Sequence, residues 1–239
     1  MFAPPAPRSL RDQRLIEGVA SNLALFWGLS PQQVAGLARY CRILEARRGE
    51  LIVERETAIP GVLALGYGTV KLSLCGANGE KRVVRLVTPG QTFGEATALL
   101  GRPSRYQARA LADSKLVVIP VAPILELIDR DPRFARRMLV SLAERMFELL
   151  GEMESTAVLR GGQRLAAYLG SLAPREGNGE CVVKLPASKT VIAGRLGMQK
   201  ETLSRLLRRL SADGLIRVSR SSIAILDSAR LRQAAEAQA

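Results

Sequence analysis

The chain has 239 residues, enough for two modest domains or one large one. Hydrophobic residues make up 47% of it and charged residues 24%, a balance that argues against a disordered protein. The net charge of +13 favours a polyanionic partner, either nucleic acid or an anionic membrane. Residues 161–239 carry 13 Lys and Arg against 6 Asp and Glu, a net +7, whereas residues 1–160 carry 22 against 16, a net +6. The C-terminal third is therefore the expected polyanion-binding part.

Several function classes are excluded by what the sequence lacks. No apolar run reaches the roughly 18 to 20 residues that span a bilayer, and the N-terminus lacks the apolar stretch of a secretory signal. We therefore expect a cytoplasmic protein with no membrane partner. The chain has no histidine, which removes His-based acid-base chemistry and His-ligated zinc or haem. With no catalytic constellation, Gly-rich phosphate loop or metal-ligand set in the sequence, we do not expect an enzyme.

The N-terminal half reads as a tail followed by a strand-rich domain. Residues 1–21 are predicted to be a Pro-rich tail that leads into a short helix. Ser30 followed by Pro31 is a good helix start, with the serine as N-cap. From about residue 43 to 121 short β-rich runs alternate with glycines, and Asn78-Gly79 is a strong hairpin signal. This pattern predicts a compact antiparallel barrel or sandwich, forming a sensor domain over 22–131.

Residues 132–160 are predicted to form one long helix. Its apolar residues recur at spacings of 3, 4, 3 and 4, the period of a coiled-coil seam; they are Leu139, Leu142, Met146, Leu149 and Met153. One alternative is a helix packed on its own barrel. A helix of this length is about 40 Å long, more than such a barrel can cover. The pattern therefore favours a dimerisation helix and a homodimer.

The C-terminal domain, 161–239, carries the signature of a winged helix. Two short helical segments, 188–196 and 199–210, are separated by a tight turn at Gly197-Met198, as in a helix-turn-helix. Ser188 is the expected N-cap of the first segment. Residues 214–226 then read as two short strands that form the wing.

The second helix of this pair has a polar face suited to reading DNA bases. Its apolar face holds Leu203, Leu206, Leu207 and Leu210. Glu201, Ser204 and Arg205 offer the chemistry for base edges, since a carboxylate accepts from cytosine N4 and an arginine forks onto guanine. Ser188, Lys200 and Thr202 are better placed for phosphates. The alternative for Glu201 is a surface pair with Arg205 worth only about 0.3–0.5 kcal/mol.

The segment "IAGRLGMQKETLSRLLRRLSADGLI" resembles the helix-turn-helix of the Crp/Fnr family of bacterial transcription regulators. Upstream, "GEKRVVRLVTPGQTFGEATALLG" is similar to that family's cyclic-nucleotide-binding-type β-roll. The resemblance implies an α+β fold with an N-terminal β-roll, a long dimerisation helix and a C-terminal winged helix-turn-helix. It also implies a homodimer that binds double-stranded DNA, with RNA polymerase as a further partner. Glu201-x-x-Ser204-Arg205 matches the Fnr branch, whose half-site is TTGA-like, and the segment is similar to Dnr-type regulators.

The resemblance also allows the family's effector sites to be tested residue by residue. Gly94 and Glu95 match the ribose-binding pair of the cyclic-nucleotide site, but the phosphate-binding Arg-Ser pair reads Ser104-Arg105, in reverse order. Aligning Arg105 instead puts Tyr106 where the serine belongs. Cyclic AMP is therefore not an expected ligand.

The sequence also contains few of the residues that the family's other sensing sites require. Residues 1–40 contain no cysteine, so an iron–sulfur cluster is not expected. Dnr-type regulators are associated with haem and nitric oxide, and without histidine the candidate haem ligands are Cys75, a methionine, a tyrosine or the N-terminal amine. Cys75 is a candidate sensing thiol or a small buried apolar residue. The signal stays open between redox state, nitric oxide and oxygen limitation, and the competing function is a small-ligand sensor acting through protein contacts.

Overall fold

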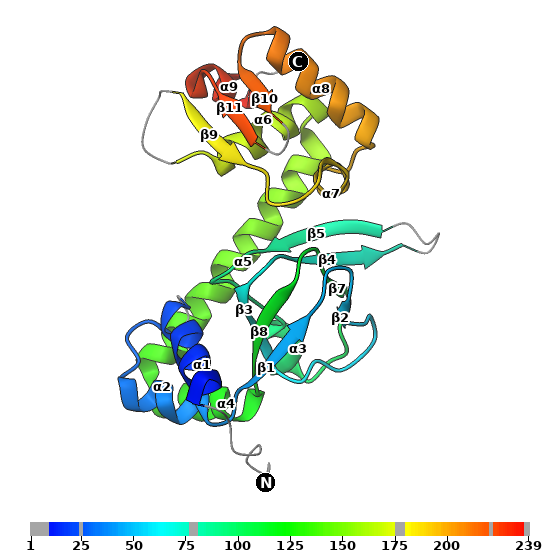
Figure 1. Cartoon of the computed structure of the whole chain (residues 1–239). Helices are drawn as coiled ribbons and strands as arrows, with labels where there is room; N and C mark the ends of the chain where they lie inside the picture. Colours follow the sequence, from blue (N-terminus) through cyan, green and yellow to red (C-terminus); the bar gives the residue numbers. More distant parts are fainter. Residues whose placement is uncertain (1–9, 24–25, 77–80, 175–179, 220–221, 237–239) are drawn as a thin grey trace. The chain divides into compact units, whose positions relative to one another are not determined.

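The computed structural model describes residues 10–23, 26–76, 81–174, 180–219 and 222–236. The chain forms two compact units, residues 1–145 and residues 146–239, and each is described by itself. Helix α5, Pro132–Val158, begins in the first unit and ends in the second, so the division falls inside the predicted dimerisation helix instead of at its ends (Figure 1). None of the described helices is long and apolar enough to cross a bilayer.

The first unit is built on two four-stranded antiparallel sheets. Their strand orders are β1-β8-β3-β6 and β2-β7-β4-β5. The strands are β1 (Arg42–Ala46), β2 (Leu51–Val53), β3 (Val62–Tyr67), β4 (Val70–Cys75), β5 (Lys81–Val87), β6 (Thr92–Phe93), β7 (Gln107–Ala110) and β8 (Ser114–Ile119). A short helix, α3 (Glu95–Leu100), follows β6. Strands β4 and β5 pair as the hairpin signal predicts, while the turn at Asn78-Gly79 lies outside the described residues.

Alternation of apolar side chains along the strands explains the core between these sheets. Leu63, Leu65, Val70, Leu72 and Phe93 are all nearly fully buried there. Sharp turns between the strands need glycine. At Gly68, which joins β3 to β4 with φ +98°, an added Cβ would collide with the Ser114 hydroxyl.

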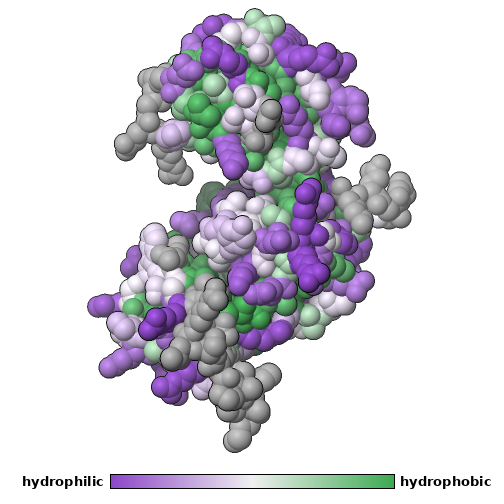
Figure 2. Space-filling view, in the orientation of Figure 1, coloured by the Kyte–Doolittle hydropathy of each residue, from purple (hydrophilic) through white to green (hydrophobic). Residues whose placement is uncertain are grey.

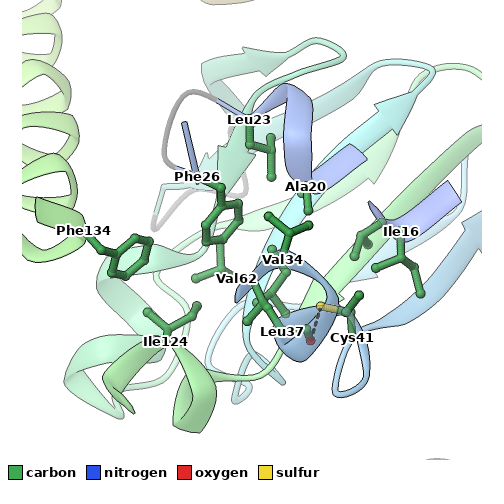
Figure 3. Close-up of a cluster of buried hydrophobic side chains, with 14 of the residues drawn as sticks. Ile16, Ala20, Leu23, Phe26, Val34, Leu37, Cys41, Val62, Ile124 and Phe134 are labelled. Carbon is green, nitrogen blue, oxygen red and sulfur yellow. Dashed lines mark hydrogen bonds between the residues drawn. The ribbon is translucent and has the colours of Figure 1, made fainter. Parts of the chain in front are cut away.

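A second core of the first unit lies where helices cover the strands (Figure 3). It involves α1 (Leu10–Asn22), α2 (Pro31–Ala38), α4 (Val121–Arg130) and the start of α5. Phe26 and Phe134 stack with ring centroids 5.8 Å apart. The Cys41 thiol is buried and donates to the Leu37 carbonyl at 3.3 Å, so this cysteine is part of the packing.

The N-terminal range predicted to be a tail, 1–21, contains helix α1. Ile16 and Ala20 on this helix are buried, with exposed fractions of 0% and 1%. Their spacing of four residues is helical, and their burial against α2 and the strands gives the short helix its tertiary support.

Two helices begin where a side chain caps the backbone N–H groups of the first turn. Ser30 and Gln33 form a reciprocal capping box at the start of α2, and Pro31 occupies the first turn, as predicted. Asp131 accepts the backbone N–H groups of Arg133 and Phe134 at the start of α5. Those hydrogen bonds, with one from Gln33, hold the pKa of the Asp131 carboxyl below its usual value.

The second unit is a winged helix. It contains the end of α5, then α6 (Gly161–Leu172), β9 (Cys181–Lys184), α7 (Lys189–Arg195), α8 (Lys200–Ala212), β10 (Ile216–Ser219), β11 (Ser222–Ile225) and α9 (Ser228–Glu236). Its sheet has the order β10-β11-β9, with antiparallel pairs. Strands β10 and β11 are the predicted wing strands, and residues 220–221 between them lie outside the described residues.

Candidate nucleic-acid interface and effector pocket

Helices α7 and α8 form the predicted helix-turn-helix. Gly197 adopts φ +63° in the turn, a left-handed conformation that glycine takes without strain. The Met198 N–H donates to the Ala193 carbonyl at 3.0 Å, which closes the turn. On α8, Leu203, Leu207 and Leu210 are buried in the unit. This burial fixes which face of α8 remains outside.

The outer face of α8 carries the residues predicted to read bases. Glu201 and Arg205 are exposed, and Ser204 between them is half-buried. Hydrophilic side chains gather over α8 in the space-filling view (Figure 2). No ion pair joins Glu201 to Arg205 within the described part of α8, so the simple surface pair is not formed in this structure. Glu201 also stands in the first helical turn, where an acid complements the helix dipole by about 0.3–1 kcal/mol.

The phosphate-contact candidates lie at the starts of α7 and α8. Lys200 is exposed at the start of α8, and Thr202 is half-buried within the first turn of the same helix. Ser188 occupies the N-cap position of α7 but makes no capping hydrogen bond. Its exposed hydroxyl differs from the expected cap and leaves its hydrogen-bonding capacity facing outward.

Further basic residues lie on the same unit without a sequence-based assignment. Arg208 and Arg209 are exposed further along α8, and Lys184 and Arg217 are exposed on the sheet. The only sequence signal for them is the charge excess of residues 161–239.

The exposed face of α5 is apolar over much of its length. Leu139, Met146, Leu149 and Met153 are exposed at 68%, 55%, 42% and 68%. Leu142, the remaining predicted seam residue, is half-buried and packs on the helical core of the first unit. Three exposed apolar residues extend the same stripe and were not predicted from the sequence; they are Val140, Phe147 and Leu150. Monomers rarely leave so large an apolar stripe in water.

The effector pocket candidates separate into two groups. Gly94, with φ +93°, precedes Glu95 at the start of α3, and Tyr106 lies against both. The Tyr106 hydroxyl is hydrogen-bonded to the Thr97 side chain and to the Gly94 backbone, while its ring packs on the core between the sheets. Burial raises the pKa of Tyr106 to about 12, and the nearby Glu95 carboxylate adds to the rise. Tyr106 therefore stays a neutral hydrogen-bonding group beside Gly94 and Glu95.

Of the other two candidates, Ser104 contacts the backbone of Tyr106 and Arg105 faces solvent. Ser104 is fully buried, and its hydroxyl donates to the Tyr106 carbonyl at 2.7 Å. Its backbone pairs with Glu56 and Thr57 across the neighbouring turn. Arg105 is exposed. Sequence reasoning gave Tyr106 no role, although the alignment on Arg105 set it at the serine position.

Cys75 ends strand β4 and is half-buried. Its carbonyl accepts a hydrogen bond from Arg55 Nη1 at 2.9 Å. Groups of three or more His, Cys, Asp or Glu side chains able to hold a metal do not occur among the residues that the structure describes.

Comparison with known proteins gives the family. The cyclic nucleotide-binding domain matches residues 43–131, and the Crp-like helix-turn-helix domain matches residues 163–234. Transcriptional regulator SdrP of Thermus thermophilus is 31% identical over 186 residues, which are 75% of this chain and 88% of that protein. The chain belongs to the Crp/Fnr family of transcription regulators.

One further relative agrees with this Crp/Fnr assignment, and one solved structure shares the fold. The cyclic AMP receptor protein of Thermus thermophilus is 26% identical over 211 residues, 88% of this chain and 96% of that protein. The structure of FixK2 from Bradyrhizobium japonicum shares the fold, with a TM-score of 0.73 at 22% identity over 83% of this chain and 99% of that one. The predicted fold class, a β-roll followed by a long helix and a Crp-type helix-turn-helix, is confirmed.

Proposed function

We propose that this Crp/Fnr protein is a homodimeric regulator that binds a TTGA-N6-TCAA-like palindrome. The observation that carries the proposal is the outer face of α8, where Glu201, Ser204 and Arg205 stand free of the unit's core. These are the residues that match the Fnr branch. Arg205 would fork onto the guanine of the half-site, Ser204 would contact the adjacent thymine, and Glu201 would accept from the cytosine paired with that guanine.

A palindrome requires two recognition helices held about 34–36 Å apart, one turn of DNA. The exposed apolar stripe of α5 supports a dimer that would supply them. Covering the stripe with a second copy removes its apolar surface from water, which favours association by roughly 25 cal/mol per Å² buried.

The proposal is tested by fluorescence anisotropy with a TTGA-N6-TCAA duplex and a scrambled duplex of the same composition at equal salt. Specific DNA-binding proteins prefer their site by about 10³-fold or more, and a preference of that order is expected. Equal affinity for the two duplexes would contradict the proposal and favour a sensor module that acts through protein contacts.

Lys200→Ala is expected to weaken binding to both duplexes alike. Lys200 lies at the end of α8 where the phosphate backbone would pass, so it positions the helix without reading sequence. The slope of log affinity against log salt should fall by about one unit. Affinity titrations at four salt concentrations measure it. A loss confined to the palindromic duplex would show instead that Lys200 reads a base.

Cyclic AMP is expected to bind weakly or not at all. A cyclic phosphodiester needs an aimed guanidinium, whereas Arg105 is exposed and Ser104 is committed to backbone hydrogen bonds. The Tyr106 hydroxyl is already hydrogen-bonded to the Gly94 backbone and the Thr97 side chain. Calorimetry should give no measurable heat for the wild type, and Tyr106→Phe should behave in the same way. A micromolar constant together with a gain in DNA affinity would overturn this prediction.

We infer that the β-roll responds to a signal other than a cyclic nucleotide. Redox state, nitric oxide and oxygen limitation are the candidates, with Cys75 as a possible thiol or ligand. The visible absorption spectrum of the purified protein tests whether haem takes part, since a Soret band would indicate bound haem.

A further inference from the structure

One guanidinium in the second unit bridges two points that are far apart in the sequence. Arg164, in the first turn of α6, donates from Nε to the Leu196 carbonyl at 2.9 Å. It also donates from Nη1 to the Leu159 carbonyl at 2.6 Å. Leu159 lies in the connection between α5 and α6, and Leu196 is the C-cap of α7, directly before the turn at Gly197. Arg164 therefore ties the end of α5 to the helix-turn-helix.

A second arginine makes a parallel tie. Arg195, in the last turn of α7, has Nη2 at 3.4 Å from Glu152 Oε1 on α5. Its guanidinium also lies over the Tyr168 ring of α6, with Cζ 5.6 Å from the centroid. Both partners of the ion pair are partly shielded, with side-chain exposures of 27% and 36%. The two arginines together connect α5, α6 and α7.

The start of α6 also lies directly against the recognition helix. A Cβ at Gly161 would lie 3.5 Å from the Leu206 side chain of α8 and 3.7 Å from Met198 in the turn. Arg164, which donates to the Leu159 and Leu196 carbonyls, thus lies in the same first turn of α6 that packs against α8. A lysine could not replace this bridge, because its single ammonium cannot reproduce two in-plane donors in a fixed fork.

We infer that Arg164 is a positioning residue that sets the spacing between the two half-sites this protein accepts. Because Arg164 joins the carbonyl at the end of α5 to the carbonyl before α8, it fixes the direction of α8 relative to the C-terminal half of α5. That half carries Met146, Leu149 and Met153, part of the apolar stripe. The inference rests on the proposed function, in which that stripe joins two copies on a palindrome.

The DNA geometry makes spacing a sensitive readout of this bridge. One base pair added between half-sites moves the second site by about 3.4 Å and rotates it by about 34°, since one turn of 34–36 Å holds 10–10.5 base pairs. A rigid pair of recognition helices tolerates only one spacer. A pair that pivots at the α5–α6 connection accepts neighbouring spacers, while the bases read within each half-site stay the same.

The test is a binding-site selection from duplexes with two randomised half-sites and spacers of different lengths. The wild type should prefer one spacer over its neighbours by at least about tenfold. A neighbouring spacer misplaces one half-site, and the resulting loss of affinity should be similar to that of a single mismatched base pair. Arg164→Met and Arg164→Lys should reduce this preference to about threefold or less while selecting the same half-site sequence. Arg230→Met, at an exposed arginine of α9, is the matched control and should behave like the wild type.

The outcomes separate the inference from the proposed function. A wild type that selects no paired half-sites contradicts the proposed function, and the inference falls with it. A wild type with one preferred spacer and Arg164 variants with the same spacer overturn the inference alone. Variants that lose spacer and half-site preference together show that Arg164 only supports the fold of α8, which also overturns it. If Arg164→Met lowers the melting temperature below the assay temperature, Arg164→Lys, which keeps the positive charge and a long unbranched side chain but loses the forked donors, decides the matter.

Discussion

Met146→Asp is expected to yield a monomer that has lost specific DNA binding. Met146 is 55% exposed on the apolar stripe of α5, where the proposed homodimer would bury it. The symmetric interface would contain the new carboxylate twice, each without a partner. An unpaired buried charge costs about 3–5 kcal/mol.

The cost of burying the new carboxylate sets the expected rise in the dissociation constant of the dimer. Even one such penalty raises the dissociation constant of the dimer by about 10²-fold or more, because each 1.4 kcal/mol is a factor of ten. Light scattering at micromolar concentration should then give the monomer mass. The preference for the palindromic duplex should fall far below the wild-type value, since a monomer occupies a single half-site.

Two variants control for effects of the substitution itself. Met146→Leu conserves the apolar side chain and should remain dimeric, and Glu144→Asp, on an exposed position of α5 outside the predicted seam, should have no effect. Leu142→Asp is a poorer test, because Leu142 packs on the core of the first unit and its loss would lower that unit's stability as well. A mass for Met146→Asp that stays at the dimer value would show that this stripe is not the interface.

The parts of the fold that could be predicted are those with strong local signals. Serine before Pro31 predicts the start of α2, and the structure contains its capping box. The runs on either side of Asn78-Gly79 predict the β4–β5 pair. The extent of helix α1 within the range predicted to be a tail could not be predicted in the same way, because the helix is stabilised by the burial of Ile16 and Ala20 against other elements.

The site shows the same division. The outer face of α8 could be predicted, because the leucine spacing fixes which side is buried. The reversed order of Ser104-Arg105 already argues against phosphate binding, but the sequence could not show that the Ser104 hydroxyl donates to the Tyr106 carbonyl. Tyr106 and Arg164 depend on neighbours that are remote in sequence, such as Gly94 for the tyrosine and Leu196 for the arginine. Local patterns do not contain that information.

Glu201→Ala is expected to raise affinity for scrambled DNA while discrimination at the G·C pair of the half-site collapses. An acid close to phosphates repels them, so its removal helps every sequence. If Glu201 accepts from cytosine, its loss removes about 1–3 kcal/mol of preference at that one base pair. Arg205→Ala should relax the same pair from the guanine side.

Three comparisons distinguish base reading from other roles of Glu201. Asp213→Ala removes another exposed acid, the C-cap residue of α8, so a purely electrostatic effect should appear there too, without a change in preference. Glu201→Gln removes the charge but retains a carbonyl acceptor, so it should keep part of the preference at the G·C pair. If Glu201 acts only on the helix dipole, Glu201→Ala should lower stability by about 0.3–1 kcal/mol and leave the selected sequence unchanged. A binding-site selection with Glu201→Ala that returns the wild-type preference at this pair would therefore remove the base-reading role and leave Arg205 to specify the guanine alone.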